Sequence, residues 1–293
     1  MKKILYLSML LVFGTQLFAA GITILSSETG ARLDLQELSQ DLQSYDLIFF
    51  GEWHGEKPLH GLQRELLEVL LKSERKLILS FEMWERQSQE YVDAFLADKI
   101  SEEEFVKKSE AWPNYEDYQP LIHLAKEHKL QVVAANVPRP YASRTAKEGW
   151  DFTKELPPEE RALIAAKLTA PEDDYRKAFF QTMGSMSGHP MKAESLQRMY
   201  EAQCMKDDTM AESIAIALKE SPKAMLLHFN GDFHSRSFLG TVSRAKAAMP
   251  ELKIAVLSPL MVEEIDEFKL DKEAASAGTH IMLMQDLAKE ESQ

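Results

Sequence analysis

The feature that most constrains this chain is a series of five short, continuous apolar runs separated by helix-like segments. The runs lie at residues 46–50, 76–81, 130–135, 223–229 and 252–257. Apolar residues recur with the helical period between them, at 59–71, 88–97, 118–128 and 195–218. Runs that are apolar throughout suit strands buried on both faces, which occur in parallel sheets covered by helices. The sequence therefore predicts an α/β fold with a mainly parallel central sheet, helices on both faces and a helical insertion over the strand carboxyl ends.

The expected domain limits follow from residues 1–20 and from the long segment before the fourth apolar run. A basic start, an apolar run and small residues up to Ala20 form the pattern of a secretory signal peptide, so we expect export to the periplasm or the cell surface. No cysteine follows Ala20, which argues against lipid anchoring through an amino-terminal cysteine. Residues 21–293 are then expected to form a single domain, with 141–218, which lacks a strand candidate, as the helical insertion.

Charge and cysteine content exclude several classes of protein. The chain has 34 Lys and Arg residues against 47 Asp and Glu residues, and its net charge of −13 argues against nucleic acid as a partner, because phosphate binding needs a basic face. Cys204 is the single cysteine, which excludes an internal disulfide framework and a cysteine-based zinc or iron–sulfur site. The sequence has no glycine-rich nucleotide loop and no nucleophile elbow, so neither a nucleotide fold nor a conventional serine hydrolase is expected.

Polar side chains follow the first four apolar runs at the point where each run ends. They are Glu52 and His54 after the first run, Glu82 after the second, Asn136 and Arg139 after the third, and Asp232 and His234 after the fourth. Because the carboxyl ends of parallel strands meet at one edge of a sheet, we expect a ligand site there. Histidine with carboxylate suits a divalent transition metal, and it equally suits general acid–base chemistry. In the simpler interpretation the histidines are ordinary loop residues, Glu82 caps a helix and Asp232 closes an Asx turn.

The order of these motifs along the chain resembles the ChaN-like family of haem-binding uptake proteins, which shares a superfamily with the Tiki and TraB proteins and the erythromycin esterases. The matching segments are 50–54, 81–87, 112–118, 134–139, 188–191, 202–203 with 208–211, and 230–234. The resemblance implies that the ligand is haem or a related iron porphyrin. It also implies an exported protein that serves haem or iron acquisition, and it favours a binding protein over an enzyme.

The wider superfamily implies an alternative function, a metal-dependent hydrolase with a divalent transition metal such as manganese, cobalt or zinc. The residues that would hold the metal and carry the catalysis are Glu52, His54, Glu82 and His234. The haem and hydrolase interpretations compete for the same edge of the sheet, and both stay open at this point. Two further partners also stay open, a membrane-associated uptake machinery and a second copy of the chain.

The expected insertion has the side chains that a haem site needs, namely apolar contacts, an iron ligand and cations for the propionates. Its aromatic, methionine and histidine residues include Tyr175, Phe179, Phe180, Met183, Met186, His189 and Met191. We expect Tyr175 or His189 to ligate the iron or to support its ligand. Met183 and Met191 are expected to contact the porphyrin, and Arg139 to meet a propionate. In the simpler interpretation these residues only fill the core of a helical hairpin, a role that methionine suits well.

Overall fold

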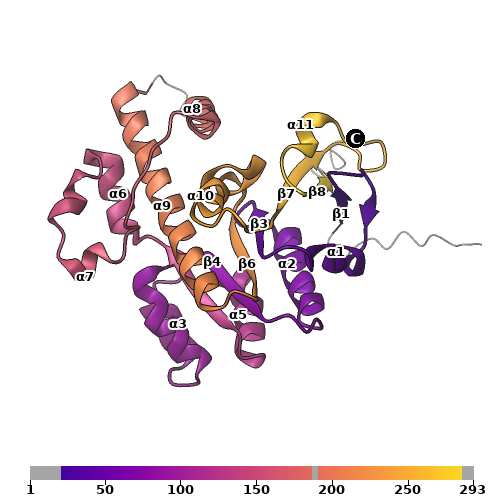
Figure 1. Cartoon of the computed structure of the whole chain (residues 1–293), viewed down its shortest axis with the longest axis horizontal. Coiled ribbons are helices and arrows are strands. Elements are labelled where there is room, and N and C mark those ends of the chain that lie inside the picture. The colour runs from indigo at the N-terminus through magenta and orange to yellow at the C-terminus, as the bar shows by residue number, and fades with distance from the viewer. Residues whose placement is uncertain (1–20, 187–190, 286–293) are drawn as a thin grey trace, which may run out of the picture.

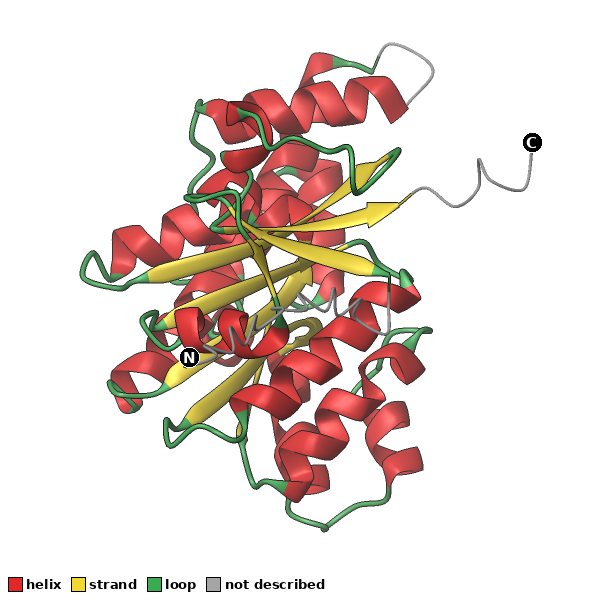
Figure 2. Cartoon of the chain, turned by 90° about the vertical axis from the view of Figure 1, so that its right-hand side faces the viewer, coloured by secondary structure: helices red, strands yellow, loops and turns green. Residues whose placement is uncertain are grey.

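An eight-stranded sheet forms the centre of the molecule, and helices cover both of its faces (Figures 1 and 2). The computed structural model describes residues 21–186 and 191–285. The sheet has the strand order β2-β1-β8-β7-β3-β6-β4-β5. Its strands are β1 (Ile22–Ser26), β2 (Arg32–Leu33), β3 (Leu47–Glu52), β4 (Leu77–Glu85), β5 (Gln131–Asn136), β6 (Met225–Gly231), β7 (Ile254–Val262) and β8 (His280–Gln285). All pairs from β8 to β5 are parallel, whereas β1 pairs antiparallel with β2 and β8, so the predicted mainly parallel α/β fold is confirmed.

Helices connect the parallel strands. The α-helices are α1 (Leu35–Leu42), α2 (Lys57–Leu70), α3 (Gln89–Leu96), α4 (Glu102–Lys108), α5 (Tyr115–Glu127), α6 (Arg139–Glu148), α7 (Pro158–Arg161), α8 (Asp174–Met186), α9 (Ala193–Glu220), α10 (Gly240–Ala248) and α11 (Lys272–Ala275). The 3-10 helices are η1 (Arg86–Ser88), η2 (Asp151–Glu155), η3 (Asp232–His234) and η4 (Arg236–Phe238). The described part of the connection between β5 and β6 contains α6 to α9 and no strand. No helix in residues 21–186 or 191–285 is both long enough and apolar enough to cross a membrane.

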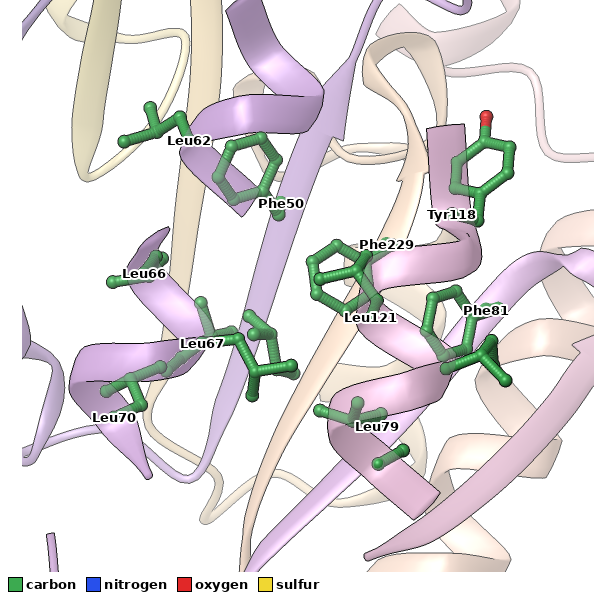
Figure 3. Packing of buried hydrophobic residues seen from close by; sticks show 14 of the residues in the cluster. Phe50, Leu62, Leu66, Leu67, Leu70, Leu79, Phe81, Tyr118, Leu121 and Phe229 are labelled. Atoms are coloured by element: carbon green, nitrogen blue, oxygen red, sulfur yellow. The ribbon is translucent and has the colours of Figure 1, made fainter. Parts of the chain in front are cut away.

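Burial on both faces explains why the parallel strands are largely apolar. Successive strand residues point to opposite faces of a sheet. Phe49 packs with Ile214 on the face covered by α9 and α10. Phe50 packs with Leu66 and Phe229 on the opposite face, under α2 and α5 (Figure 3). Both phenylalanines are fully buried, and each such side chain stabilises the fold by roughly 1.5–3 kcal/mol relative to an exposed position.

The sequence patterns do not predict three of the strands, β1, β2 and β8. Strand β2 contains only two residues, and β1 follows directly after the expected signal peptide. Strand β8 includes Met282 and Met284, and methionine fits a helix as well as a strand. Strand β8 is extended because it lies between β7 and β1 and pairs with both of them. Strand β1 lies at the other end of the sequence. Long-range pairing of this kind leaves little local signal.

The side chain of Gln89 covers the outer edge of β5, which is the last strand of the sheet. Its Nε2 donates to the carbonyl of Val132 at 2.8 Å, and its Oε1 accepts from the N–H of Ala134 at 2.8 Å. These are the two backbone groups that a neighbouring parallel strand would use opposite Val133. The glutamine amide therefore takes the place of a peptide unit at this edge.

Candidate functional site

The carboxyl ends of β3, β4 and β6 bring predicted polar residues together around Gly231. In the parallel register of β3 and β6, Glu52 lies opposite Gly231. A Cβ atom at Gly231 would lie 2.9 Å from Nε2 of His54 and 3.6 Å from Oε2 of Glu82, so glycine makes room for the His54 ring. The N–H of Gly231 donates to Oε2 of Glu82 at 2.8 Å. The Glu82 side chain from within β4 and the His54 side chain from just after β3 thus meet over the end of β6.

Glu52 and His54 form a carboxylate–imidazole pair that faces solvent on the imidazole side. Nδ1 of His54 lies 2.8 Å from Oε1 of Glu52. The hydroxyl of Tyr118 donates to the same oxygen at 2.6 Å, and Nε2 of Gln63 donates to the other oxygen at 2.5 Å. The Glu52 side chain is buried, whereas that of His54 is 42% exposed and lies edge-on to the ring of Trp112. The buried carboxylate therefore orients an accessible imidazole.

This pair has the properties of an acid–base group. Burial disfavours protonation of His54, but the hydrogen bond to Glu52 and the charge of Glu82 outweigh it and raise the pKa of His54 above its ordinary value. Burial and the Glu52 carboxylate raise the pKa of Tyr118, so its phenol stays protonated and continues to donate. An oriented imidazole with a free second nitrogen can accept or release a proton on a bound ligand.

His234 lies in a different environment, buried between two carboxylates. Its Nδ1 lies 2.7 Å from Oδ1 of Asp207 on α9, and its Nε2 lies 3.3 Å from Oε1 of Glu82 on β4. Asp207 also accepts hydrogen bonds from the hydroxyls of Thr241 and Tyr175, each at 2.7 Å. The imidazole is thus held on both sides by residues from separate elements.

Electrostatics keep this group of residues ionised. Burial disfavours the charged form of His234, yet the charges of Glu82 and Asp207 overcome it and raise the pKa of His234 to about 10. Burial likewise disfavours the carboxylate of Glu82, but its interaction with His234 lowers the pKa of Glu82 well below the usual range. The pKa of Asp207 is lowered for the same reason, against the effect of burial. A buried imidazolium flanked by two carboxylates is the result.

The four residues predicted as metal ligands are close together but form two carboxylate–imidazole pairs. Glu52 pairs with His54, and Glu82 pairs with His234. Among the described residues, no three or more His, Cys, Asp or Glu side chains are placed to hold a metal ion. Both nitrogens of His234 already face carboxylates, and a protonated imidazole cannot ligate a metal. In this arrangement the residues do not fit a resident divalent metal.

The residues predicted to bind haem lie in several places. Tyr175 is 1% exposed, and its hydroxyl already donates to a partner of His234. Met183 on α8 and Met191 just before α9 are half-buried, and Arg139 is exposed at the first position of α6, after the end of β5. His189 lies outside the described residues. Burial raises the pKa of Tyr175 well above its usual value, and the charge of Asp207 adds to this effect.

The polar residues at the strand ends did not indicate the residues of α9 and α2 that complete the site. Asp207 holds His234, Gln63 holds Glu52, and Nε2 of Gln203 lies 3.2 Å from Nε2 of His234. For Asp207, an available signal was the pair of acidic residues at 207 and 208 between Met205 and Met210 of a long helix. Buried acidic residues in a helix need partners, so such a pair points to an ion-pair network.

The sequence model of the family described as "Haem-binding uptake, Tiki superfamily, ChaN" matches residues 38–245. The chain therefore belongs to this family, as its motifs predicted. No curated protein matches the sequence at a significant level.

A solved structure shares the fold of this chain. ChaN of Campylobacter jejuni, whose structure is described as showing cofacial haem binding, aligns with a TM-score of 0.67 and 17% identity over 89% of this chain and 96% of that chain. An erythromycin esterase in its open conformation aligns with a TM-score of 0.46 and 8% identity over 82% of this chain and 76% of that chain. A Bacillus cereus protein aligns with a TM-score of 0.45 and 11% identity over 79% of this chain and 70% of that chain.

Replacing Asp207 with asparagine should lower the pKa of His234 from about 10 toward the ordinary value of 6.5, because one of its two carboxylates is lost. A raised folded-state pKa means that His234 stabilises the wild type fully below about pH 6.5 and loses this contribution as the pH rises toward about 10. The free energy of unfolding of the Asp207→Asn variant should therefore fall less than that of the wild type over this pH range. NMR titration of the imidazole protons gives the pKa, and urea unfolding at several pH values gives the stability.

The control variant is Asp208→Asn, on the same helix. Asp208 pairs with Arg244 at 2.7 Å, so its replacement should leave the titration of His234 close to that of the wild type. An unchanged pKa of His234 in Asp207→Asn would contradict the electrostatic role assigned to Asp207.

Proposed function

We propose that this chain binds haem, or a related iron porphyrin, beside the carboxyl ends of the strands and serves haem or iron acquisition. The observation that carries the proposal is a half-buried apolar surface at the meeting point of α8, α9 and η3. This α8–α9 surface consists of Phe180, Met183, Met199 and Phe233, which pack over a buried aromatic cluster that includes Tyr175. Membership of a haem-binding uptake family supports the choice of ligand.

The residues present fit the two chemical requirements of a porphyrin, which is an apolar disc with carboxylates at one edge. The α8–α9 surface supplies apolar contacts. The guanidinium of Arg176 stacks over the ring of Phe180 at 4.1 Å, and Arg139 offers a second, exposed cation beyond β5. Met191 is half-buried just before α9 and is proposed as a further contact. The bound iron would supply the spectroscopic and redox properties of haem.

Tyr175 is proposed as part of the wall of the site. Its ring packs against Phe233 with 5.2 Å between the ring centroids, and its hydroxyl donates to Asp207. Ligation of iron by tyrosine requires the phenolate, which burial and the Asp207 carboxylate disfavour because they raise the pKa of Tyr175. His189 keeps its proposed role as a candidate iron ligand from the sequence, and it lies outside the described residues.

Haemin titration of the purified protein should give a saturable Soret band distinct from that of free haemin. Replacing Met183 with glutamate should weaken the affinity about tenfold or more, because a carboxylate would face the apolar porphyrin and would have to be desolvated. Tyr175→Phe should alter the Soret band more than Tyr45→Phe, because Tyr45 precedes β3 at the opposite end of the sheet.

The control for the methionine is Met261→Glu, a substitution in β7 at a side chain that is 41% exposed. It adds the same charge and should leave the affinity for haemin within about twofold of the wild-type value. A titration of the wild type that matches that of an unrelated acidic protein would contradict haem binding.

We also propose that the chain is exported to the periplasm or the cell surface. The support is the basic, apolar and small-residue pattern of residues 1–20, which lie outside the described residues. Mass spectrometry of the protein from an exporting bacterial host should find a chain that lacks this segment in the exported fraction. A full-length chain confined to the cytoplasm would contradict the proposal.

A second candidate function is hydrolysis by acid–base chemistry at the same edge of the sheet. The observation that favours it is the accessible imidazole of His54, oriented by buried Glu52 and placed beside Gly231. In this function Nε2 of His54 would accept a proton from an attacking water and return it to the leaving group. Glu82 and His234 would supply fixed charges under the ligand.

Calorimetric titration with manganese, cobalt and zinc tests whether a metal takes part. We expect no stoichiometric, tight uptake by chelator-treated wild type, because the carboxylates and imidazoles pair with one another. His234→Ala should then lower the stability of the protein more than His54→Ala does. Loss of His234 leaves two buried carboxylates without their cation, whereas His54 is partly exposed. Uptake of about one equivalent that both variants abolish would instead establish a metal-dependent centre.

A further inference from the structure

We propose that Lys206 on α9 receives a propionate carboxylate of the porphyrin and so fixes the direction in which the ligand lies on the α8–α9 surface. This inference rests on the proposed haem-binding function. It adds a residue that determines specificity for an anionic porphyrin and that no motif of the sequence indicated.

The position of Lys206 on the helix supports this role. It lies three residues after Gln203 and directly before Asp207, and both of these neighbours contact the His234 imidazole. Met199 precedes Lys206 by seven residues, which is two helical turns, so the two side chains leave α9 on the same side. Seven residues span about 10 Å along a helix, comparable with the width of a porphyrin ring.

Met199, Gln203 and Lys206 lie along one side of α9, and their chemistry changes along it while their exposure is similar. Met199, Gln203 and Lys206 are all half-buried, so each offers part of its side chain to a ligand. Met199 belongs to the apolar α8–α9 surface, whereas Lys206 ends in an ammonium group. An apolar end and a cationic end separated by two turns match a disc that carries its carboxylates at one edge.

The ammonium group of Lys206 is available for a ligand. Among the described residues, no carboxylate lies within ion-pairing distance of it, although the buried carboxylate of Glu82 lies close enough to feel its charge. The two oxygens of Glu82 are already occupied by the N–H of Gly231 and by Nε2 of His234. A half-buried lysine without its own counter-ion is suited to an incoming carboxylate, because much of its desolvation has already occurred.

The simpler role for Lys206 is to balance the charge of Glu82 without touching any ligand. The two roles differ in how affinity depends on the ligand's own carboxylates. A lysine that binds a propionate discriminates between haemin and haemin dimethyl ester, whose propionates are neutral esters. A lysine that only balances Glu82 acts equally on both compounds.

The test compares the affinities of haemin and haemin dimethyl ester in a detergent buffer that keeps both monomeric. Wild type should bind haemin roughly tenfold more tightly than the ester, because one charge-assisted hydrogen bond is lost. Lys206→Met, which keeps the side-chain length but removes the charge, should bring the two affinities within about twofold of each other. Lys206→Arg should restore most of the preference.

The matched control is Lys219→Met, in the last turn of the same helix, where the lysine is exposed. It should retain the wild-type preference for haemin. A preference unchanged in Lys206→Met, or lost equally in Lys219→Met, would overturn the role of Lys206. Failure of wild type to bind haemin at all would instead overturn the proposed function, and thermal melting of each apo variant identifies any loss of folding.

Discussion

The arrangement of the carboxyl edge depends on one buried cation, the imidazolium of His234. It joins three elements that are distant in the sequence, because Glu82 comes from β4, Asp207 from α9 and His234 from η3 after β6. Removing one partner of a buried ion pair typically costs about 3–5 kcal/mol, since the remaining charge stays buried without compensation. The same interaction holds the middle of α9 over the strand ends, and so it sets where the α8–α9 surface lies relative to the sheet.

Residues 51–54 and 231–234 share the pattern Gly-x-x-His, but their histidines differ in physical role. His54 shares a single hydrogen bond with Glu52 and keeps its outer nitrogen toward solvent. His234 is enclosed by carboxylates on both sides and holds its proton far above neutral pH. Only the first imidazole presents a nitrogen to solvent where it can exchange a proton with a ligand, whereas the second acts as a fixed charge. A duplicated motif therefore provides one accessible group and one internal support.

Much of the fold could be predicted because burial on both sheet faces leaves continuous apolar runs that are easy to recognise. The strand-end rule also predicted that Glu52 and His54 would approach Glu82 and His234, although their chemical role stays a prediction. The contribution of α9 could not be predicted, because the rotation of a helix about its axis follows from packing and not from its own sequence. The acidic pair at 207 and 208 points to a buried ion pair, but it does not identify His234 as the partner of Asp207.

The amide of Gln89 has a consequence for how copies of this chain can meet. It satisfies the two outward-facing backbone groups of β5 at Val132 and Ala134. A strand added at this margin would first have to displace these two hydrogen bonds. Extension of the sheet there would therefore begin with an unfavourable change in free energy. The opposite margin is β2, which offers only two residues as a template. A partner that adds a strand would therefore gain little at either margin of the sheet.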